Sequence, residues 1–146
     1  MKRIALILLA GVVFLGATAC KSATAPDVDD FVGTWNATKA EYTSVANSST
    51  KVDIIPQGST FVVVFSASTF VLTITDPGQN PRVYNGTWTS SVDTLTLTWT
   101  SGLSGESQFD FVLDGDNLTL AGGHMQFEFT PGSPEEAILS LILSRQ

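Results

Sequence analysis

The side chains that could do chemistry are few and lie far apart in this chain. The sequence has one histidine, His124, and one cysteine, Cys20. No serine stands in the Gly-x-Ser-x-Gly turn of a hydrolase, and His124 lacks the neighbouring His or Cys ligands that a metal site requires. We therefore expect no catalytic residue, no metal site and no cofactor, which means that the protein is not an enzyme.

Two acidic stretches suggest chemistry only superficially. The sequence DGDN at 114 to 117 has calcium-type ligands, but it lacks the longer spacing and the final glutamate of an EF-hand loop. Glu135 and Glu136 are adjacent, so on a strand their side chains would point to opposite faces and could not share acid/base work. We interpret the first stretch as an acidic turn.

A binding site is the remaining possibility, and Arg82 with Tyr84 is its one polar candidate. Two residues apart on a strand, these side chains share a face and could hold a carboxylate while its tail lies among aromatic rings. Arg82 also follows Pro81 at a strand start, where side chains usually meet water. Six residues form the candidate ligand-binding set: Arg82, Tyr84, Trp88, Trp99, Phe111 and Phe127.

The elements that would position these residues are β-strands, because apolar and polar residues alternate almost everywhere after residue 30. Short turns between them favour antiparallel neighbours, with Gly122-Gly123 suited to a two-residue hairpin. We expect eight to ten strands: 32–43, 51–55, 60–66, 69–75, 82–90, 95–99, 109–113, 117–121, 125–129 and 137–145.

Each of the eight to ten expected strands has one apolar face, and these faces must be buried away from water. Closing the sheet into an antiparallel up-and-down β-barrel does this and also removes the sheet edges. A β-sandwich is the alternative. The alternation does not decide whether the barrel encloses a cavity or a core that side chains fill completely.

The N-terminal residues predict export. Lys2 and Arg3 precede an apolar run over 4–16 that is too short to span a bilayer, which is typical of a signal peptide over residues 1–19. The small, polar and acidic segment 20–30 is expected to be a flexible tether, and residues 31–146 one domain.

The net charge of the exported chain limits which classes of partner it could bind. Two of the seven basic residues lie in residues 1–19, so five remain against fourteen acidic residues, a net charge of −9. Such a surface repels phosphate backbones, and we expect no nucleic-acid partner.

Two resemblances add to this reading. The sequence ATAC at 17 to 20 resembles the lipobox of bacterial lipoproteins, which implies a lipid on Cys20. Lys21, rather than an aspartate, follows the cysteine. In this the sequence resembles Gram-negative lipoproteins that are sorted to the outer membrane. The resemblance implies a cell-envelope protein whose partner is the membrane; the alternative is an ordinary signal peptide whose removal leaves a free thiol.

The second resemblance concerns the fold. FVGTW at 31 to 35 resembles the start of the calycins, the lipocalin and fatty-acid-binding barrels. There the tryptophan lies across the closed end of the barrel and a late arginine packs over it, which implies the trio Gly33, Trp35 and Arg145 here. The chain lacks the helical pair of the fatty-acid-binding branch.

The order of the short motifs along the chain points to one branch of this family. GTW, EYTS, a second GTW, DTLTLT, NLTL and a terminal LILSRQ together resemble bacterial lipocalin-like domain lipoproteins over residues 31–146. This resemblance implies a membrane-anchored, non-catalytic protein that binds a small hydrophobic ligand if the barrel is open. The alternative is a structural or inhibitor-type envelope lipoprotein with a solid barrel, whose loops 43–50 and 101–105 contact another protein.

Overall fold

The computed structural model describes residues 25–146, and the segment 1–19 that is expected to be a signal peptide lies outside this range, as does Cys20. Apart from one short helix the elements are strands, and most of them are rich in the threonine, valine and aromatic residues that fit a pleated surface. In chain order they are α1 (Val28–Phe31), β1 (Gly33–Ser44), β2 (Lys51–Asp53), β3 (Thr60–Phe65), β4 (Thr69–Thr75), β5 (Arg82–Ser90), β6 (Thr94–Ser101), β7 (Gly105–Asp114), β8 (Asn117–Thr130) and β9 (Ser133–Arg145).

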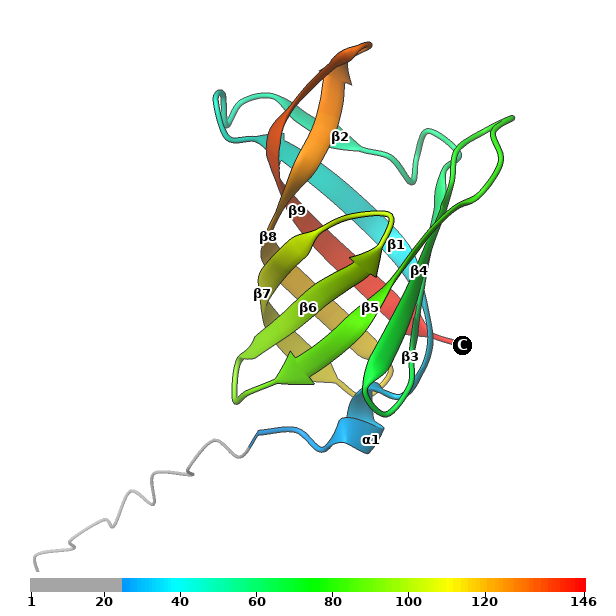
Figure 1. Cartoon of the computed structure of the whole chain (residues 1–146), viewed down its shortest axis with the longest axis vertical. Helices are drawn as coiled ribbons and strands as arrows, with labels where there is room; N and C mark the ends of the chain where they lie inside the picture. The colour runs from blue at the N-terminus through cyan, green and yellow to red at the C-terminus, as the bar shows by residue number, and fades with distance from the viewer. Residues whose placement is uncertain (1–24) are drawn as a thin grey trace, which may run out of the picture.

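The strands form one antiparallel sheet that closes on itself (Figure 1). From β3 to β9 each strand pairs with its neighbours in the chain, and β1 joins β3 on one side and β9 on the other. Eight strands therefore make a closed up-and-down barrel, and β2 is an extra strand. The expectation of a barrel is confirmed, and the alternative of a β-sandwich is wrong.

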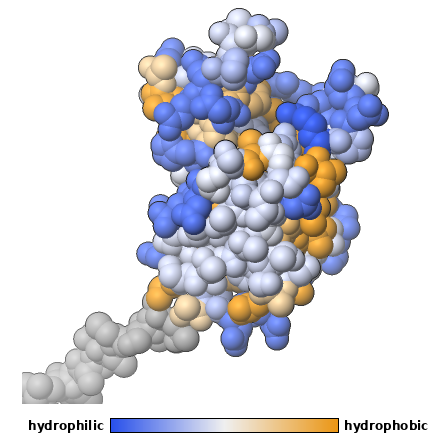
Figure 2. All heavy atoms as spheres, viewed as in Figure 1, coloured by the Kyte–Doolittle hydropathy of each residue, from blue (hydrophilic) through white to orange (hydrophobic). Residues whose placement is uncertain are grey.

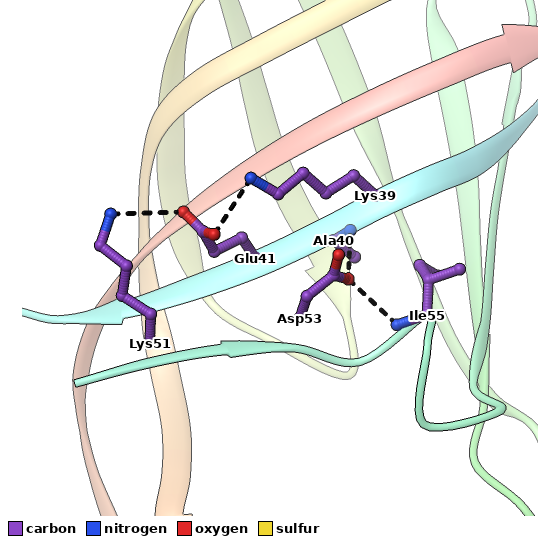
Figure 3. Close-up of polar contacts among 6 residues, drawn as sticks. All are labelled: Lys39, Ala40, Glu41, Lys51, Asp53 and Ile55. Atoms are coloured by element: carbon purple, nitrogen blue, oxygen red, sulfur yellow. Dashed lines mark hydrogen bonds and ion pairs between the residues drawn. The ribbon is translucent and has the colours of Figure 1, made fainter. Parts of the chain in front are cut away.

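The extra strand lengthens the wall of the barrel beside β1. Residues Gly33–Asn36 of β1 pair with β3, and Glu41–Thr43 pair with β2 on the same edge. Between these two stretches, the carboxylate of Asp53 accepts hydrogen bonds from the backbone N–H groups of Ala40 and Ile55, both at 3.1 Å (Figure 3). The side chain thus supplies the acceptor that a continuous partner strand would have given.

An ion cluster on the outer face ties β2 to β1. The carboxylate of Glu41 lies 3.0 Å from the ammonium of Lys39 and 3.5 Å from that of Lys51 (Figure 3). The hydrogen bond from Lys39, with the positive charges of both lysines, lowers the pKa of Glu41 below its ordinary value. Because all three side chains meet water, the stabilisation is small.

The glycine pair 122–123 does not form the expected hairpin. Strand β8 continues through it as far as Thr130, and its register against β9 shifts between Leu120 and Gly123. Gly122 adopts a positive φ of 90°, and a Cβ on Gly123 would lie 2.0 Å from the ring of Phe109. The pair is a β-bulge in which one glycine provides the kink and the other makes room for a core ring.

The helix α1 begins inside the segment 20–30 that was expected to be a tether. Its last residue, Phe31, is fully buried and enters the core that fills the lower end of the barrel. The ordered domain therefore starts no later than Val28. Among residues 25–146, none of the helical structure is long and apolar enough to cross a membrane.

Candidate functional site

One end of the barrel is closed by a packed tryptophan. Trp35 is fully buried, and its indole N–H donates to the carbonyl of Phe31 at 2.8 Å. The guanidinium carbon of Arg145 lies 4.4 Å from the centre of the Trp35 ring. This distance permits a cation–π interaction, and it joins the first strand to the last.

The same arginine also holds the segment that leads into β1. Its guanidinium donates to the carbonyl of Val32 at 2.6 Å and to the carbonyl of Asp30, and it lies 3.3 Å from the carboxylate of Asp116. Gly33 adopts a φ of +145°, and a Cβ there would approach a guanidinium nitrogen to 3.2 Å. Gly33, Trp35 and Arg145 are thus brought together at the closed end.

Two members of the candidate ligand-binding set belong to this end. Trp88 and Phe111 each lie 5.2 Å, centre to centre, from the ring of Phe31. The indole N–H of Trp88 is already bonded to the carbonyl of Ser66 at 2.8 Å. Both residues therefore fill the closed end of the barrel, with no group facing a cavity.

The middle of the barrel is filled as well. A void of only about 10 Å³ remains among the apolar side chains there, which is at the lower limit of what a single water needs. Trp99 packs edge to face on Phe70 at 5.0 Å, and its N–H donates to the hydroxyl of Ser107 at 3.0 Å. Trp99 is thus part of the packed core, and its edge also lines an open surface pocket of about 560 Å³ together with Leu103 and Met125.

A cavity of about 520 Å³ occupies the opposite, open end of the barrel. In Figure 1 this is the end that carries β2, the β4–β5 loop and the β8–β9 hairpin, and Figure 2 shows hydrophilic residues surrounding it. Its volume is in the range of small-molecule sites. The lining residues are Tyr42, Ile54, Gln57, Ser59, Leu72, Ile74, Asp76, Arg82, Tyr84, Leu103, Met125, Gln126, Phe127, Glu128 and Pro134.

One wall of the cavity is a stacked aromatic pair. The rings of Tyr42 and Phe127 lie 4.0 Å apart at an angle of 17°. Tyr42 is only 4% exposed, and this burial raises the pKa of its hydroxyl although the positive charge of Arg82 opposes the shift. Within residues 25–146 no group forms a hydrogen bond with that hydroxyl, which leaves it available to a ligand.

The polar side of the cavity is a chain of three side chains. The hydroxyl of Ser59 donates to one carboxylate oxygen of Asp76 at 2.7 Å, and the guanidinium of Arg82 donates to the other at 2.6 Å. Tyr84 stands beside them, with its ring 6.3 Å from that of Trp99. The structure therefore places Arg82 at the cavity, but with its charge already matched by Asp76.

The cavity thus contains part of the candidate set and several residues that the sequence did not single out. Arg82, Tyr84 and Phe127 line it, whereas Tyr42, Ser59 and Asp76 were not predicted. Tyr42 carries a signal that could have been used, because its buried face on β1 follows the same alternation as Ala40 and Ser44.

The lone histidine lies on the outside of the barrel. A ring nitrogen of His124 is 2.7 Å from the carboxylate of Glu136 on the next strand, and both side chains are more than half exposed. Within residues 25–146 no group of three His, Cys, Asp or Glu side chains is placed to hold a metal ion. The pair contributes a surface contact between β8 and β9.

Comparison with known proteins yields little. No family model matches the chain, and no curated protein matches it. Among solved structures it is similar to an uncharacterized protein from Bacteroides eggerthii DSM 20697, at 14% sequence identity and a TM-score of 0.47. The match covers 80% of this chain and 99% of that one. At this identity and TM-score the likeness carries no conclusion about function.

Proposed function

We propose that this chain is a non-catalytic, lipocalin-like binding protein whose open barrel end takes a small, largely apolar molecule. The observation that carries the proposal is the contrast between the two ends of the barrel. One end is closed by Trp35, Arg145 and Phe31, whereas the other holds a cavity of about 520 Å³ whose lining combines apolar and aromatic side chains with polar and charged ones. A cavity of this kind is the usual form of a small-molecule site.

The closed end also supports the calycin family as the source of the fold. The arginine over the tryptophan ring, the glycine before it and the up-and-down barrel together match what the resemblance of FVGTW implied. Each of these features alone is common, but here one guanidinium joins the start and the end of the domain.

We further propose that the protein is attached to a bacterial envelope membrane through a lipid on Cys20. The support is in the sequence: an apolar run of signal-peptide length, the lipobox-like ATAC and a cysteine that occurs once. Lys21 favours the outer membrane as its location.

The alternative is an interaction protein with a solid barrel, and two observations favour it. The void in the middle of the barrel is only about 10 Å³. Val64, Val71 and Val83 are exposed on the outside of neighbouring strands, and Figure 2 shows apolar atoms on the flank over β3 and β4.

A binding assay separates the two functions. Residues 25–146 contain the whole barrel, so the soluble form that starts at Lys21 keeps the fold. We expect the neutral fluorescent probe N-phenyl-1-naphthylamine to bind it saturably. Leu103→Trp fills the cavity from a loop and should abolish this binding, whereas Val112→Trp, on an outward position that is 66% exposed, should not. Absent or non-saturable binding would support the interaction protein instead.

A further inference from the structure

We propose that the cavity selects a compact, uncharged ligand with a hydroxyl or amide group, and that it excludes carboxylates such as fatty acids. This inference rests on the proposed binding function and names the class of ligand. It follows from three properties of the cavity: its charges, its free hydrogen-bonding groups and its depth.

The charges of the cavity disfavour an anion. Within residues 25–146, Arg82 is the one cationic side chain that lines it, and its guanidinium is paired with Asp76 at 2.6 Å. Ser59 holds the second oxygen of Asp76 at 2.7 Å, so the carboxylate is fixed in place. Glu128 also lines the cavity, which leaves one negative charge in excess. A carboxylate ligand would have to displace Asp76 or lie beside it, and like charges at such range repel.

A cation is not favoured either. Arg82 lines the same cavity and would repel a positive ligand. The carboxylate of Glu128 already accepts a hydrogen bond from the backbone N–H of Gly132 at 2.9 Å. The carboxylate of Asp76 is likewise occupied by its two donors. A positive ligand would therefore meet one carboxylate that Arg82 neutralises, a second one that is hydrogen-bonded to Gly132 and exposed to water, and a guanidinium that repels it.

Neutral hydrogen-bonding groups are what the cavity leaves free. The hydroxyls of Tyr42 and Tyr84 have no partner within residues 25–146, although both residues line the cavity. A phenolic hydroxyl can donate and accept. A phenol is already protonated at neutral pH, and burial raises the pKa of Tyr42 further. A ligand hydroxyl or amide matches such groups without the cost of burying a charge.

The depth of the cavity limits the apolar part of the ligand. Leu72 lines both the cavity above and the void of about 10 Å³ below it, so the packed middle of the barrel is the floor of the cavity. A long alkyl chain would have to enter that packed region. A compact body such as a single aromatic ring can instead rest against Leu72, Met125 and Phe127.

Three ligands that differ only in their polar group test the proposal. We would measure displacement of N-phenyl-1-naphthylamine from the soluble form at pH 7 by 4-phenylbutanamide, 4-phenylbutanoate and 4-phenylbutylamine. We expect the amide to bind about tenfold more tightly than the carboxylate and the amine, which is the factor that about 1.4 kcal/mol produces.

A pair of variants tests whether the negative charge of Asp76 is what disfavours a carboxylate ligand. Asp76→Asn removes the charge that compensates Arg82 and keeps an oxygen for Ser59, so it should raise the affinity for the carboxylate about tenfold. Asp110→Asn removes the same charge from an exposed position on β7 and should leave the affinity unchanged. Tryptophan emission verifies that both variants are folded.

The outcomes are distinct. If the carboxylate or the amine binds as tightly as the amide, the inference is overturned and the binding function stands. If the wild type binds neither the probe nor any of the three ligands, the proposed function itself is overturned, and the inference with it. If Asp110→Asn raises carboxylate affinity as much as Asp76→Asn does, the local charge argument is wrong.

Discussion

Replacing Arg145 by alanine should open the closed end of the barrel and destabilise the whole domain. The side chain makes three kinds of contact at once: with the ring of Trp35, with the carbonyls of Asp30 and Val32, and with the carboxylate of Asp116. Because Arg145 ends the last strand and Asp30, Val32 and Trp35 lie at the start of the domain, the loss should be felt in global unfolding.

The magnitude can be worked from these contacts. The cation–π contact contributes about 1 kcal/mol. Each carbonyl that loses its charged donor costs about 1 to 1.5 kcal/mol, a value reduced because the Arg145 side chain is 25% exposed. The pair with Asp116 adds nothing measurable, since that side chain is 80% exposed. We expect a loss of about 3 kcal/mol, or a fall in Tm of about 10 to 15 °C for a domain of this size.

Urea unfolding followed by tryptophan emission measures this loss. Arg145→Lys is the matched control, because it keeps the charge and the stem but has no planar fork, and it should recover about half of the stability. In single-tryptophan backgrounds, emission from Trp35 should shift in Arg145→Ala far more than emission from Trp88, which packs on Phe31 without touching the arginine.

Two results would refute this reasoning. An Arg145→Ala protein within about 0.5 kcal/mol of the wild type would show that the contacts do not hold the closed end. Equal emission changes at Trp35 and Trp88 would show that the effect is general loosening of the core.

Three further predictions concern other parts of the chain. Gly123→Ala should cost about 3 kcal/mol because its Cβ would collide with the Phe109 ring, whereas Gly122→Ala meets open space and should cost about 1 kcal/mol for its positive φ; equal losses in urea unfolding would contradict the bulge. The raised pKa of Tyr42 means that above pH 10.0 the unfolded chain releases a proton that the folded one keeps, so stability should fall as pH rises past that value. Tyr42→Phe should weaken this fall, and an unchanged pH profile would argue against the burial of the hydroxyl. Cys20→Ser should move the protein from the membrane fraction to the soluble fraction, and unchanged membrane association would disprove the lipid anchor.

Most of the strand pattern could be predicted from the sequence because a strand that buries one face must alternate. Residues 95–99 and 109–113 show this alternation plainly, and both lie within strands of the barrel. The closing of the sheet into a barrel could be predicted from the number of strands and the shortness of the turns between them. The glycine pair 122–123 was misjudged because a turn and a bulge both require a positive φ. What decides between them is the ring of Phe109, which packs there from another strand.

The position of the cavity was not predictable from the alternation. A period of two tells which face a side chain occupies, but not its height in the barrel. Tyr84 and Trp88 share a face of β5 only four residues apart, about 13 Å along the strand. That distance is enough to place one at the cavity and the other at the closed end.

The charge pairing of Arg82 was also beyond the sequence pattern. Asp76 lies in the loop between β4 and β5, and its carboxylate contacts the guanidinium of Arg82. The sequence indicated a cation on the inner face, and only the loop geometry shows that this cation is compensated. Whether Arg82 could bind a carboxylate ligand therefore depended on a contact with a loop residue, which the alternation does not reveal.

The placement of α1 at the closed end decides which end of the barrel would lie nearer to a lipid anchor. The described chain enters the barrel there (Figure 1). The cavity opens at the far end. With a lipid on Cys20, the seven residues 21–27 reach at most about 25 Å. The bilayer would then lie beneath the shut end and the mouth would look outward. Cargo would be exchanged with the surrounding aqueous compartment or with a protein arriving from it, and would not be drawn from the supporting membrane.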